Sequence, residues 1–197
     1  KVASSSAGPG GGSSAALLGS LGCSLAAMVC KLTYSNKKYQ SVWARMKELN
    51  AKMEDYSLKF LHLVDADSEV FTDLMRARKL PQQTEAEKQE RKFAIEHAIQ
   101  KATQIPLRCM EYVAQALEAL NEIAQKGNKN VISDVGVAVL SCFSALEGAM
   151  FNVKINLKGI HDDEFRKDVD NKMKLYYSKS LELKQKIIKK VKESLEG

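Results

Sequence analysis

An aspartate interrupts a regular apolar pattern in the second of the helices that the sequence predicts. Apolar residues recur there at steps of four and three, as on one face of a helix, and the same steps lead from Leu63 to Asp67 and on to Val70. A carboxylate that faces a core is costly unless it is paired or hydrogen-bonded. Asp67 is therefore either the partner of an Arg or Lys on a neighbouring helix or a catalytic or ligand-binding acid.

A second unusual pattern lies further along the chain, where a narrow face of small and polar residues runs beside an apolar one. Its members follow steps of four and three and are Asp134, Ala138, Ser141, Ala145, Gly148, Asn152 and Asn156. The small central side chains leave room for another helix or for a flat ligand. Asp134 either complements the helix N-terminus or takes part in chemistry. Asn152 and Asn156 are poor helix formers and good hydrogen-bonding groups, so we expect them to orient a ligand.

A glycine-rich loop, Gly8-Pro9-Gly10-Gly11-Gly12, precedes the first predicted helix. It lacks the Gly-Lys-Ser/Thr of a Walker loop and the GxGxxG of a dinucleotide site. It is either a flexible lead-in or a set of backbone N–H groups that can bind a carboxylate or phosphate at a helix N-terminus. The three histidines show no metal-ligand spacing, so no metal site is predicted.

These residues must be positioned by helices, because strand signals are almost absent. Ser13 and Ser14 are expected to cap a first helix that runs to about Thr33 after a lead-in over residues 1–12. The second helix is expected at Lys38–Lys79 and the fourth at Ser133–Lys158. The third is expected to begin at a Thr84–Glu87 capping box and to end at Lys126, with Pro106 inside it. Asp162 is expected to cap the fifth. The sequence therefore predicts an all-α fold, an up-and-down bundle of about five long helices.

Size and composition indicate a single domain over residues 1–197. The chain has 45% hydrophobic residues, and its small-residue first helix is expected to be buried at the centre rather than to span a membrane. Four cysteines without ligand spacing are expected to be reduced core residues of a cytoplasmic protein. Helices near 40 residues, roughly 60 Å long, favour a homodimer or higher homo-oligomer.

The formal charge of +6 favours an anionic ligand. The basic residues lack the aromatic interleaving of a nucleic-acid reader, so no nucleic-acid partner is expected. A non-catalytic helical scaffold or binding protein remains compatible with this composition.

Several motifs, taken in order, resemble those of one family. They are GPGGGSSAAL (residues 8–17), MVCKLTY (28–34), LVDADSEVF (63–71), RKLP (78–81), the region of Ile105-Pro106-Leu107, GNKNVISD (127–134) and FNVKINLKGIHDDEF (151–165). The set is similar to the cyclodeaminase domain of formimidoyltransferase-cyclodeaminase and to its stand-alone relatives, which include methenyltetrahydrofolate cyclohydrolases. Ser35-Asn36 departs from the glycine and basic residue that relatives often have.

The resemblance implies a reaction on a folate. In 5-formimidoyltetrahydrofolate the N10 amine attacks the formimidoyl carbon, ammonia leaves, and cationic 5,10-methenyltetrahydrofolate forms. Ring closure needs positioning, a base for the N10 proton and an acid for the leaving nitrogen. The resemblance thus implies a tetrahydrofolate derivative as substrate, expected to be polyglutamylated, and no metal. Hydrolysis of the methenyl compound on the same fold is the alternative.

The resemblance supports the positions of the site residues, and we assign their expected roles from the chemistry. Asp67 is expected to be the acid/base residue, with Asp134 as its partner or replacement, and Asn152 and Asn156 are expected to orient the pterin or the amidine. The residues expected to hold the folate and its anionic glutamate tail are Gly10, Gly11, Gly12, Ser13, Lys38 and Lys79. Asn128, within the GNKNVISD motif, is expected to contact substrate as well.

Overall fold

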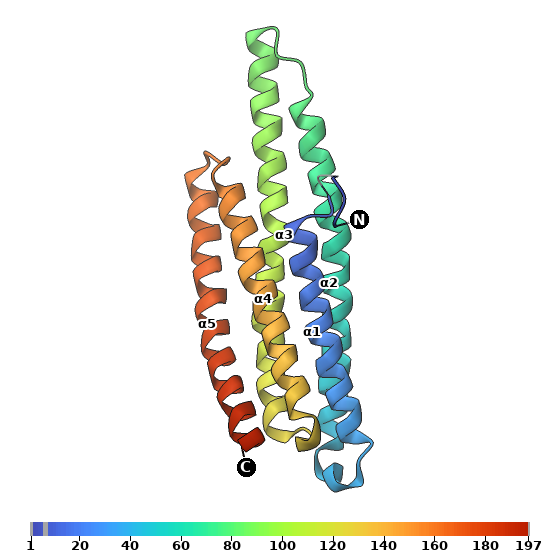
Figure 1. Ribbon diagram of the computed structural model, residues 1–197. Helices are drawn as coiled ribbons and strands as arrows, with labels where there is room; N and C mark the ends of the chain where they lie inside the picture. Colours follow the sequence, from blue (N-terminus) through green and yellow to red (C-terminus); the bar gives the residue numbers. More distant parts are fainter. Residues whose placement is uncertain (1, 6–7, 197) are drawn as a thin grey trace.

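A computed structural model describes residues 2–5 and 8–196, and within these residues it contains helices and no strand. Five α-helices run up and down in chain order (Figure 1), as predicted. They are α1 (Gly11–Tyr34), α2 (Trp43–Arg78), α3 (Glu85–Lys126), α4 (Ile132–Leu157) and α5 (Asp163–Glu196). Short 3-10 helices, η1 (Lys37–Val42) and η2 (Lys129–Val131), precede α2 and α4.

Helix α1 packs between α2 and α4, and its small residues allow close approach. A Cβ added to Gly22 would lie 2.8 Å from the carbonyl oxygen of Ala138 and 2.6 Å from Cys142 Sγ. The small residues in the middle of the α4 face therefore make room for the helix α1. For that part of the face, the interpretation as a helix contact is correct and the interpretation as a ligand site is not. The prediction that α1 is buried at the centre is wrong, because its outer side stays exposed at Leu17 and Leu21.

Two helices are apolar enough to raise the question of a membrane. By length and hydropathy, Gly11–Tyr34 and Lys129–Leu157 each meet the requirement for a membrane-spanning helix. In the bundle, 56% and 50% of their most apolar windows are buried, as in core helices that leave one side uncovered. Their uncovered sides lie next to each other because α1 and α4 pack together.

Most predicted helix boundaries agree with the structure, and the exceptions are the starts of the first two helices. The second helix is predicted from Lys38, but Lys37–Val42 forms the 3-10 helix η1 and α2 begins at Trp43. The first helix begins at Gly11, before both serines that are expected to cap it, and no side chain caps its N-terminus. Thr84 and Glu87 form the predicted capping box, and Asp162 Oδ1 accepts the N–H of Phe165 at the start of α5. The lead-in thus ends at Gly10.

The four cysteines are buried and free, as predicted. Burial raises the pKa of the Cys30 thiol to about 12. The pKa of Cys23 is also raised, first by a hydrogen bond with Cys142 and then by burial. The Cys23 and Cys30 thiols are therefore neutral core groups at physiological pH.

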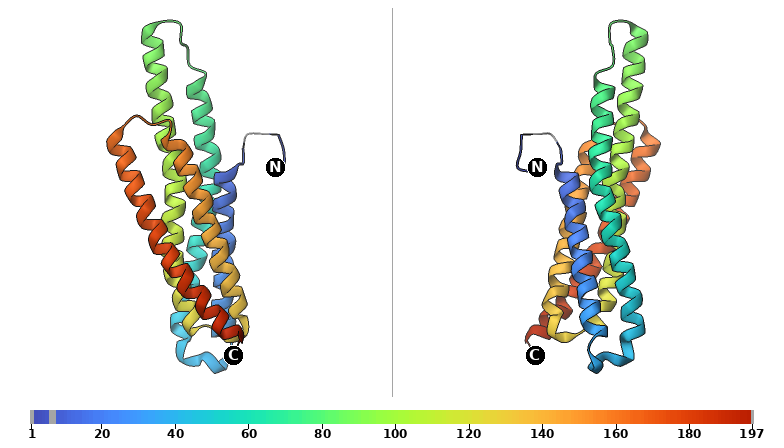
Figure 2. Two further views of the ribbon diagram at one scale, coloured as in Figure 1. Left: turned by 60° about the vertical axis from the view of Figure 1, so that its left-hand side comes forward. Right: turned by 90° about the vertical axis from the view of Figure 1, so that its right-hand side faces the viewer.

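The helices differ in length, and this difference makes the two ends of the bundle unlike each other. At 1.5 Å per residue, α2 and α3 measure about 54 and 63 Å, whereas α1 measures about 36 Å. The α2–α3 hairpin therefore projects beyond the other helices (Figure 2). We call the end where α1 begins the site end, and the end carrying η1 and η2 the loop end.

Candidate active site

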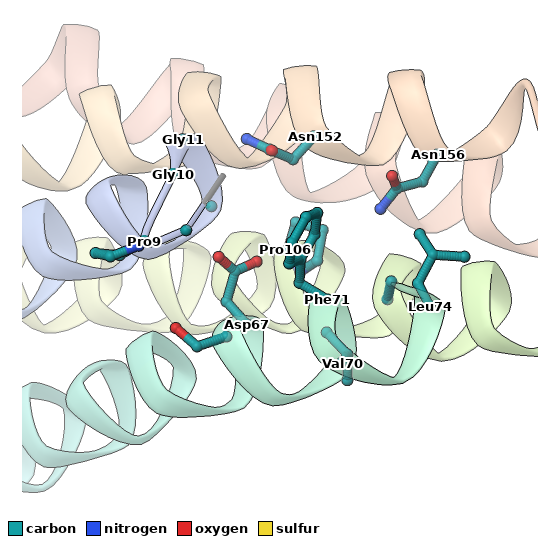
Figure 3. Close-up of a pocket in the computed structure, with 14 residues that line it drawn as sticks. Pro9, Gly10, Gly11, Asp67, Val70, Phe71, Leu74, Pro106, Asn152 and Asn156 are labelled. Atoms are coloured by element: carbon teal, nitrogen blue, oxygen red, sulfur yellow. The ribbon is translucent and has the colours of Figure 1, made fainter. Parts of the chain in front are cut away.

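A cavity of about 170 Å³ lies at the site end, where α1 begins between helices that continue past it. Because α1 begins only at Gly11, it does not fill the space between its neighbours at this end of the bundle. Side chains of α2, α3 and α4 line that space (Figure 3). The lining residues are Gly8, Pro9, Gly10, Gly11, Gly12, Asp67, Ser68, Val70, Phe71, Leu74, Ala102, Pro106, Asn152 and Asn156. The only ionisable group among them is Asp67.

Asp67 projects into this cavity from α2, beside the first turn of α1 (Figure 3). The buried Ser13 hydroxyl donates a hydrogen bond of 2.7 Å to Asp67 Oδ2. Within residues 2–5 and 8–196, no lysine, arginine or histidine forms an ion pair with Asp67. The interpretation of Asp67 as half of a structural ion pair between helices is therefore wrong.

The glycine loop is needed because the carboxylate lies directly against it. A Cβ on Gly12 would come within 2.8 Å of Asp67 Cγ and closer still to Oδ1, so any larger residue would displace the carboxylate. The first N–H groups of α1 have no side-chain cap and carry the positive end of the helix dipole. The Asp67 carboxylate thus accepts a hydrogen bond from a hydroxyl and lies against a helix terminus, and no cation among residues 2–5 and 8–196 pairs with it.

Two amides of α4 face the same cavity one turn apart (Figure 3). Asn152 Nδ2 donates 2.8 Å to the carbonyl of Gly148, which leaves its Oδ1 available as an acceptor. The Asn156 side chain has no hydrogen bond within the described part of the chain and keeps both its amide functions for a ligand. The polar end of the α4 face therefore borders a ligand-sized space, unlike its middle.

The remaining wall of the cavity is apolar. Phe71 and Leu74 come from α2, and Ala102 and Pro106 from α3. Sequence reasoning did not select these four as site residues, although Phe71 and Pro106 belong to the recognised motifs and Leu74 to the apolar stripe. An aromatic and a proline ring beside polar groups suit a flat heterocycle with hydrogen-bonding edges.

Five predicted site residues do not line this cavity; Ser13 lies behind it and bonds to Asp67, and the other four lie far from it. Asp134 is on the correct face of α4, but it lies 18 residues before Asn152, about 27 Å away along the helix. Lys38 belongs to η1 at the loop end. The first residue of α2, Trp43, already lies about 36 Å from Asp67 along the helix axis, and Lys38 precedes it. Lys79 is exposed at the opposite end of α2, about 18 Å beyond Asp67.

Asn128 is the fourth, and it serves the fold at the loop end. Its backbone N–H donates 2.9 Å to Thr33 Oγ1, and its side chain accepts 3.1 Å from the N–H of Asn130. Asn128 therefore joins α1 to the η2 turn. The structure brings together Asp67, Gly10, Gly11, Gly12, Ser13, Asn152 and Asn156, and separates Asp134, Lys38, Lys79 and Asn128 from them.

The described residues, 2–5 and 8–196, contain no group of three or more His, Cys, Asp or Glu side chains that is arranged to hold a metal ion. Near the cavity, burial and then the charges of Cys142 and Asp67 raise the pKa of the Cys109 thiol. Cys109 is therefore a neutral neighbour of the carboxylate. The chemistry available from the lining is proton transfer by one carboxylate, with hydrogen bonding by two amides and a helix terminus.

Comparisons with known proteins show what the chain is similar to. Residues 1–175 match the family described as Formiminotransferase-cyclodeaminase. The chain is 37% identical over 194 residues to a methenyltetrahydrofolate cyclohydrolase from Methylorubrum extorquens, covering 98% of this chain and 93% of that one. It is 39% identical over 166 residues to formimidoyltransferase-cyclodeaminase from Rattus norvegicus, covering 84% of this chain and 31% of that protein.

A solved structure shares the architecture as well. The crystal structure of formiminotetrahydrofolate cyclodeaminase from Thermotoga maritima aligns with a TM-score of 0.88 at 29% identity, covering 98% of this chain and 93% of that one. Against the rat protein, in contrast, the chain spans about a third of the relative's length. With the family match over most of the sequence and relatives above 30% identity, the chain belongs to the formiminotransferase-cyclodeaminase family.

Proposed function

We propose that this protein is a formimidoyltetrahydrofolate cyclodeaminase, which closes 5-formimidoyltetrahydrofolate to 5,10-methenyltetrahydrofolate and releases ammonia. The observation that carries the proposal is the Asp67 carboxylate, which borders an open cavity and has no cationic partner among the described residues. A carboxylate in that setting can accept a proton and stabilise a cation. Both the amidine substrate and the methenyl product offer such a cation.

The proposed mechanism uses Asp67 twice. Its carboxylate accepts the N10 proton as the N10–carbon bond forms, and then returns that proton to the formimino nitrogen as the carbon–nitrogen bond breaks and ammonia leaves. Ser13 holds Oδ2, so Oδ1 is the oxygen left for the transferred proton. Positive charge persists into the product, and the carboxylate stabilises it throughout.

The other lining residues position the substrate in this proposal. Asn152 Oδ1 and the Asn156 amide meet the polar edge of the pterin or the amidine, while Phe71 and Pro106 contact the ring faces. Their contribution is to hold N10 close to the formimidoyl carbon, which lowers the entropic part of the barrier. The reaction suits disposal of the formimino group from histidine breakdown in the cytoplasm.

Hydrolysis of 5,10-methenyltetrahydrofolate is the second candidate, favoured by the 37% identity to a cyclohydrolase over nearly the whole chain. This reaction needs a base that accepts a proton from water instead of from N10, and the Asp67 carboxylate could serve as that base. Incubation of the purified protein with 5-formimidoyltetrahydrofolate tests the choice. Methenyl absorbance together with ammonia supports the cyclodeaminase; turnover of the methenyl compound alone supports the cyclohydrolase. Failure to bind any folate would support a non-catalytic scaffold.

We propose further that the protein forms a homodimer through the outer face of α1 and α4. Large apolar side chains are exposed there at Leu17, Leu21, Met28 and Leu32 of α1 and at Val137, Leu140, Phe151 and Ile155 of α4. Adjacent helix faces with exposed large apolar side chains are typical of an interface with another protein copy. Light scattering of the purified chain at micromolar concentration is expected to give twice the monomer mass, and a monomer would contradict the proposal.

A further inference from the structure

The orientation of the Asn152 amide is fixed by the helix on which it lies. Its Nδ2 donates a hydrogen bond of 2.8 Å to the carbonyl oxygen of Gly148, one turn earlier in α4. Turning the amide over would bring Oδ1 next to that carbonyl oxygen, and two acceptors without a proton between them repel each other. Asn152 therefore presents Oδ1, an acceptor, to the cavity.

Asp67 and Asn152 approach the start of α1 from two different helices. Asp67 packs on Gly12, where an added Cβ would lie 2.8 Å from Asp67 Cγ. Asn152 lies against Gly11, where an added Cβ would lie 3.8 Å from Asn152 Oδ1. Because Gly11 and Gly12 are consecutive, the two side chains border the same part of the cavity (Figure 3). A carboxylate and an amide oxygen, both hydrogen-bond acceptors, thus face this part together.

Two acceptors that face one part of a cavity select a ligand group with N–H donors. The formimidoyl group of 5-formimidoyltetrahydrofolate is such a group, because its terminal nitrogen carries two N–H bonds and a positive charge when the amidine is protonated. A formyl group has nearly the same shape but ends in an oxygen, which is an acceptor. In the same position it would face Asp67 and Asn152 Oδ1 without a proton to donate.

We propose that Asn152 determines the specificity of this site for the formimidoyl group against the formyl group. The inference rests on the proposed function, since it takes the formimidoyl folate as the ligand of the cavity, and it assigns Asn152 to the amidine and not to the pterin. One N–H of the terminal nitrogen donates to Asn152 Oδ1 and the other to the Asp67 carboxylate. A formyl ligand is rejected because it leaves both acceptors unpaired.

Asn156 is placed differently, although it is the same residue type on the same face of α4. It lies one turn, about 6 Å, further along the helix from the residue that borders Gly11. Its side chain has no hydrogen bond within the described residues, so its amide can turn to meet either a donor or an acceptor. Asn156 therefore offers a matched control, an amide of the same cavity that does not distinguish the two groups.

The test compares the binding of two folates that differ only in this group, 5-formimidoyltetrahydrofolate and 5-formyltetrahydrofolate, both as monoglutamates. Dissociation constants are measured by stopped-flow titration, in which binding is complete before turnover. The wild type is expected to bind the formimidoyl compound about 100-fold more tightly. Asn152→Leu keeps the size of the side chain but removes the acceptor, so it is expected to lower this ratio about tenfold.

The ratio of the two dissociation constants separates specificity from damage to the fold. Asn156→Leu is expected to weaken the binding of both folates by a similar factor and to leave the ratio unchanged. A disturbed fold would also weaken both. Asn152→Ala, which introduces a smaller side chain, is expected to change the ratio in the same direction as Asn152→Leu.

The inference is overturned if the wild type binds both folates equally, if Asn152→Leu leaves the ratio unchanged, or if Asn156→Leu lowers it as much. The proposed reaction survives these outcomes when the wild type forms the methenyl compound and ammonia from the formimidoyl folate. If the ratio depends on Asn152 but no ammonia is released, the proposed reaction fails and the role of Asn152 stands. If neither folate binds, both proposals fail.

Discussion

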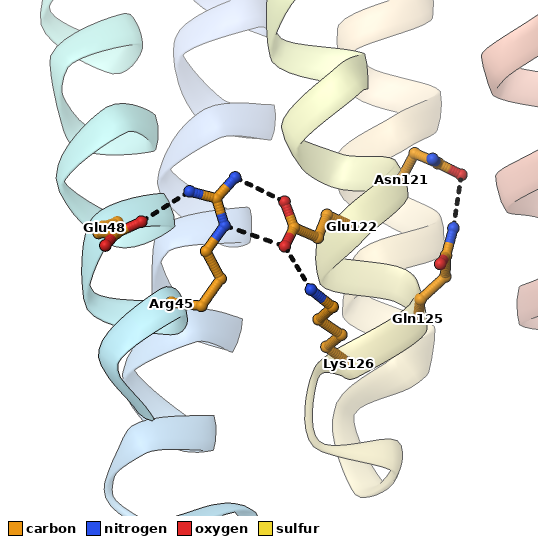
Figure 4. A network of polar contacts seen from close by, with 6 residues as sticks. All are labelled: Arg45, Glu48, Asn121, Glu122, Gln125 and Lys126. Carbon is orange, nitrogen blue, oxygen red and sulfur yellow. Dashed lines mark hydrogen bonds and ion pairs between the residues drawn. The ribbon is translucent and has the colours of Figure 1, made fainter. Parts of the chain in front are cut away.

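The two ends of the bundle use polar residues in opposite ways. At the loop end, Arg45 of α2 bonds to Glu122 of α3 through Nε at 2.9 Å and Nη2 at 2.7 Å, and Lys126 donates to the same carboxylate (Figure 4). At the site end, Asp67 has a single side-chain partner and Asn156 has none among the described residues. Polar groups in a cavity that lack protein partners are the ones that a ligand must satisfy.

The ion pairs that stabilise the loop end and the cavity proposed for the reaction thus lie about half the length of the bundle apart. Pro106, in the cavity, and Glu122, in the loop-end network, are 16 residues apart on α3, about 24 Å along its axis. Substitutions at one end are therefore expected to change activity with little effect on stability, and substitutions at the other end the reverse. Each of the following predictions tests one side of that contrast.

The largest effect is expected for Asp67→Asn. The amide keeps the shape of the side chain but cannot accept the N10 proton, so we expect kcat to fall by roughly 10²–10⁴-fold. Asparagine can still accept the Ser13 hydrogen bond, so the melting temperature is expected to change little. Turnover followed by methenyl absorbance, with thermal melting in parallel, measures both. Retained activity would remove Asp67 from the reaction.

A smaller but still large loss is expected for Gly12→Ala. The added Cβ would overlap the Asp67 carboxylate, and a shift of about 1 Å in a reacting group can cost roughly 100-fold in rate. Gly11→Ala is the matched comparison, because its Cβ would lie 3.5 Å from Asn152 Nδ2, an ordinary contact distance. Steady-state kcat for both variants decides the point, and equal losses would show that the close approach at Gly12 is not what matters.

The sequence pattern was sufficient to identify which helix faces border the site, but not the position of the site along the helix axes. The interruption at Asp67 and the pair Asn152–Asn156 follow from helical period alone, and both border the cavity. Asp134 shares the face of Asn152, yet it lies about 27 Å away, because periodicity fixes the angle around a helix and says nothing about which residues of other helices stand beside it.

Residues that came from the resemblance alone show a different limitation. A motif contains residues that hold a turn together as well as residues that meet a ligand, and Asn128 belongs to the first kind. The cavity itself could not be predicted, since it arises from the difference in length between α1 and its neighbours at one end. The start of α1 at Gly11 instead of after Ser13 is the detail that brings the Ser13 hydroxyl to Asp67.

The smallest effect is expected at the loop end, for Glu122→Gln. Hydrogen bonds from Arg45 and then from Lys126 lower the pKa of the Glu122 carboxyl to about 2. A lowered pKa in the folded state adds stability above the ordinary value of 4.5, and this contribution is lost as the pH falls through about 2. Because the pair is partly exposed, the contribution is expected to be about 1 kcal/mol.

Urea unfolding of the wild type and Glu122→Gln measures this contribution, with a difference of about 1 kcal/mol expected near pH 7 and almost none near pH 2. Glu48→Gln is the matched control, because Glu48 also bonds to Arg45, at 2.6 Å, but has a side chain that is 64% exposed against 23% for Glu122. Its effect is expected to be smaller. Turnover should be unchanged in both variants, since the network lies far from the cavity. Loss of activity at unchanged stability would contradict the separation of the two ends, because it would make the loop-end ion pairs part of the site.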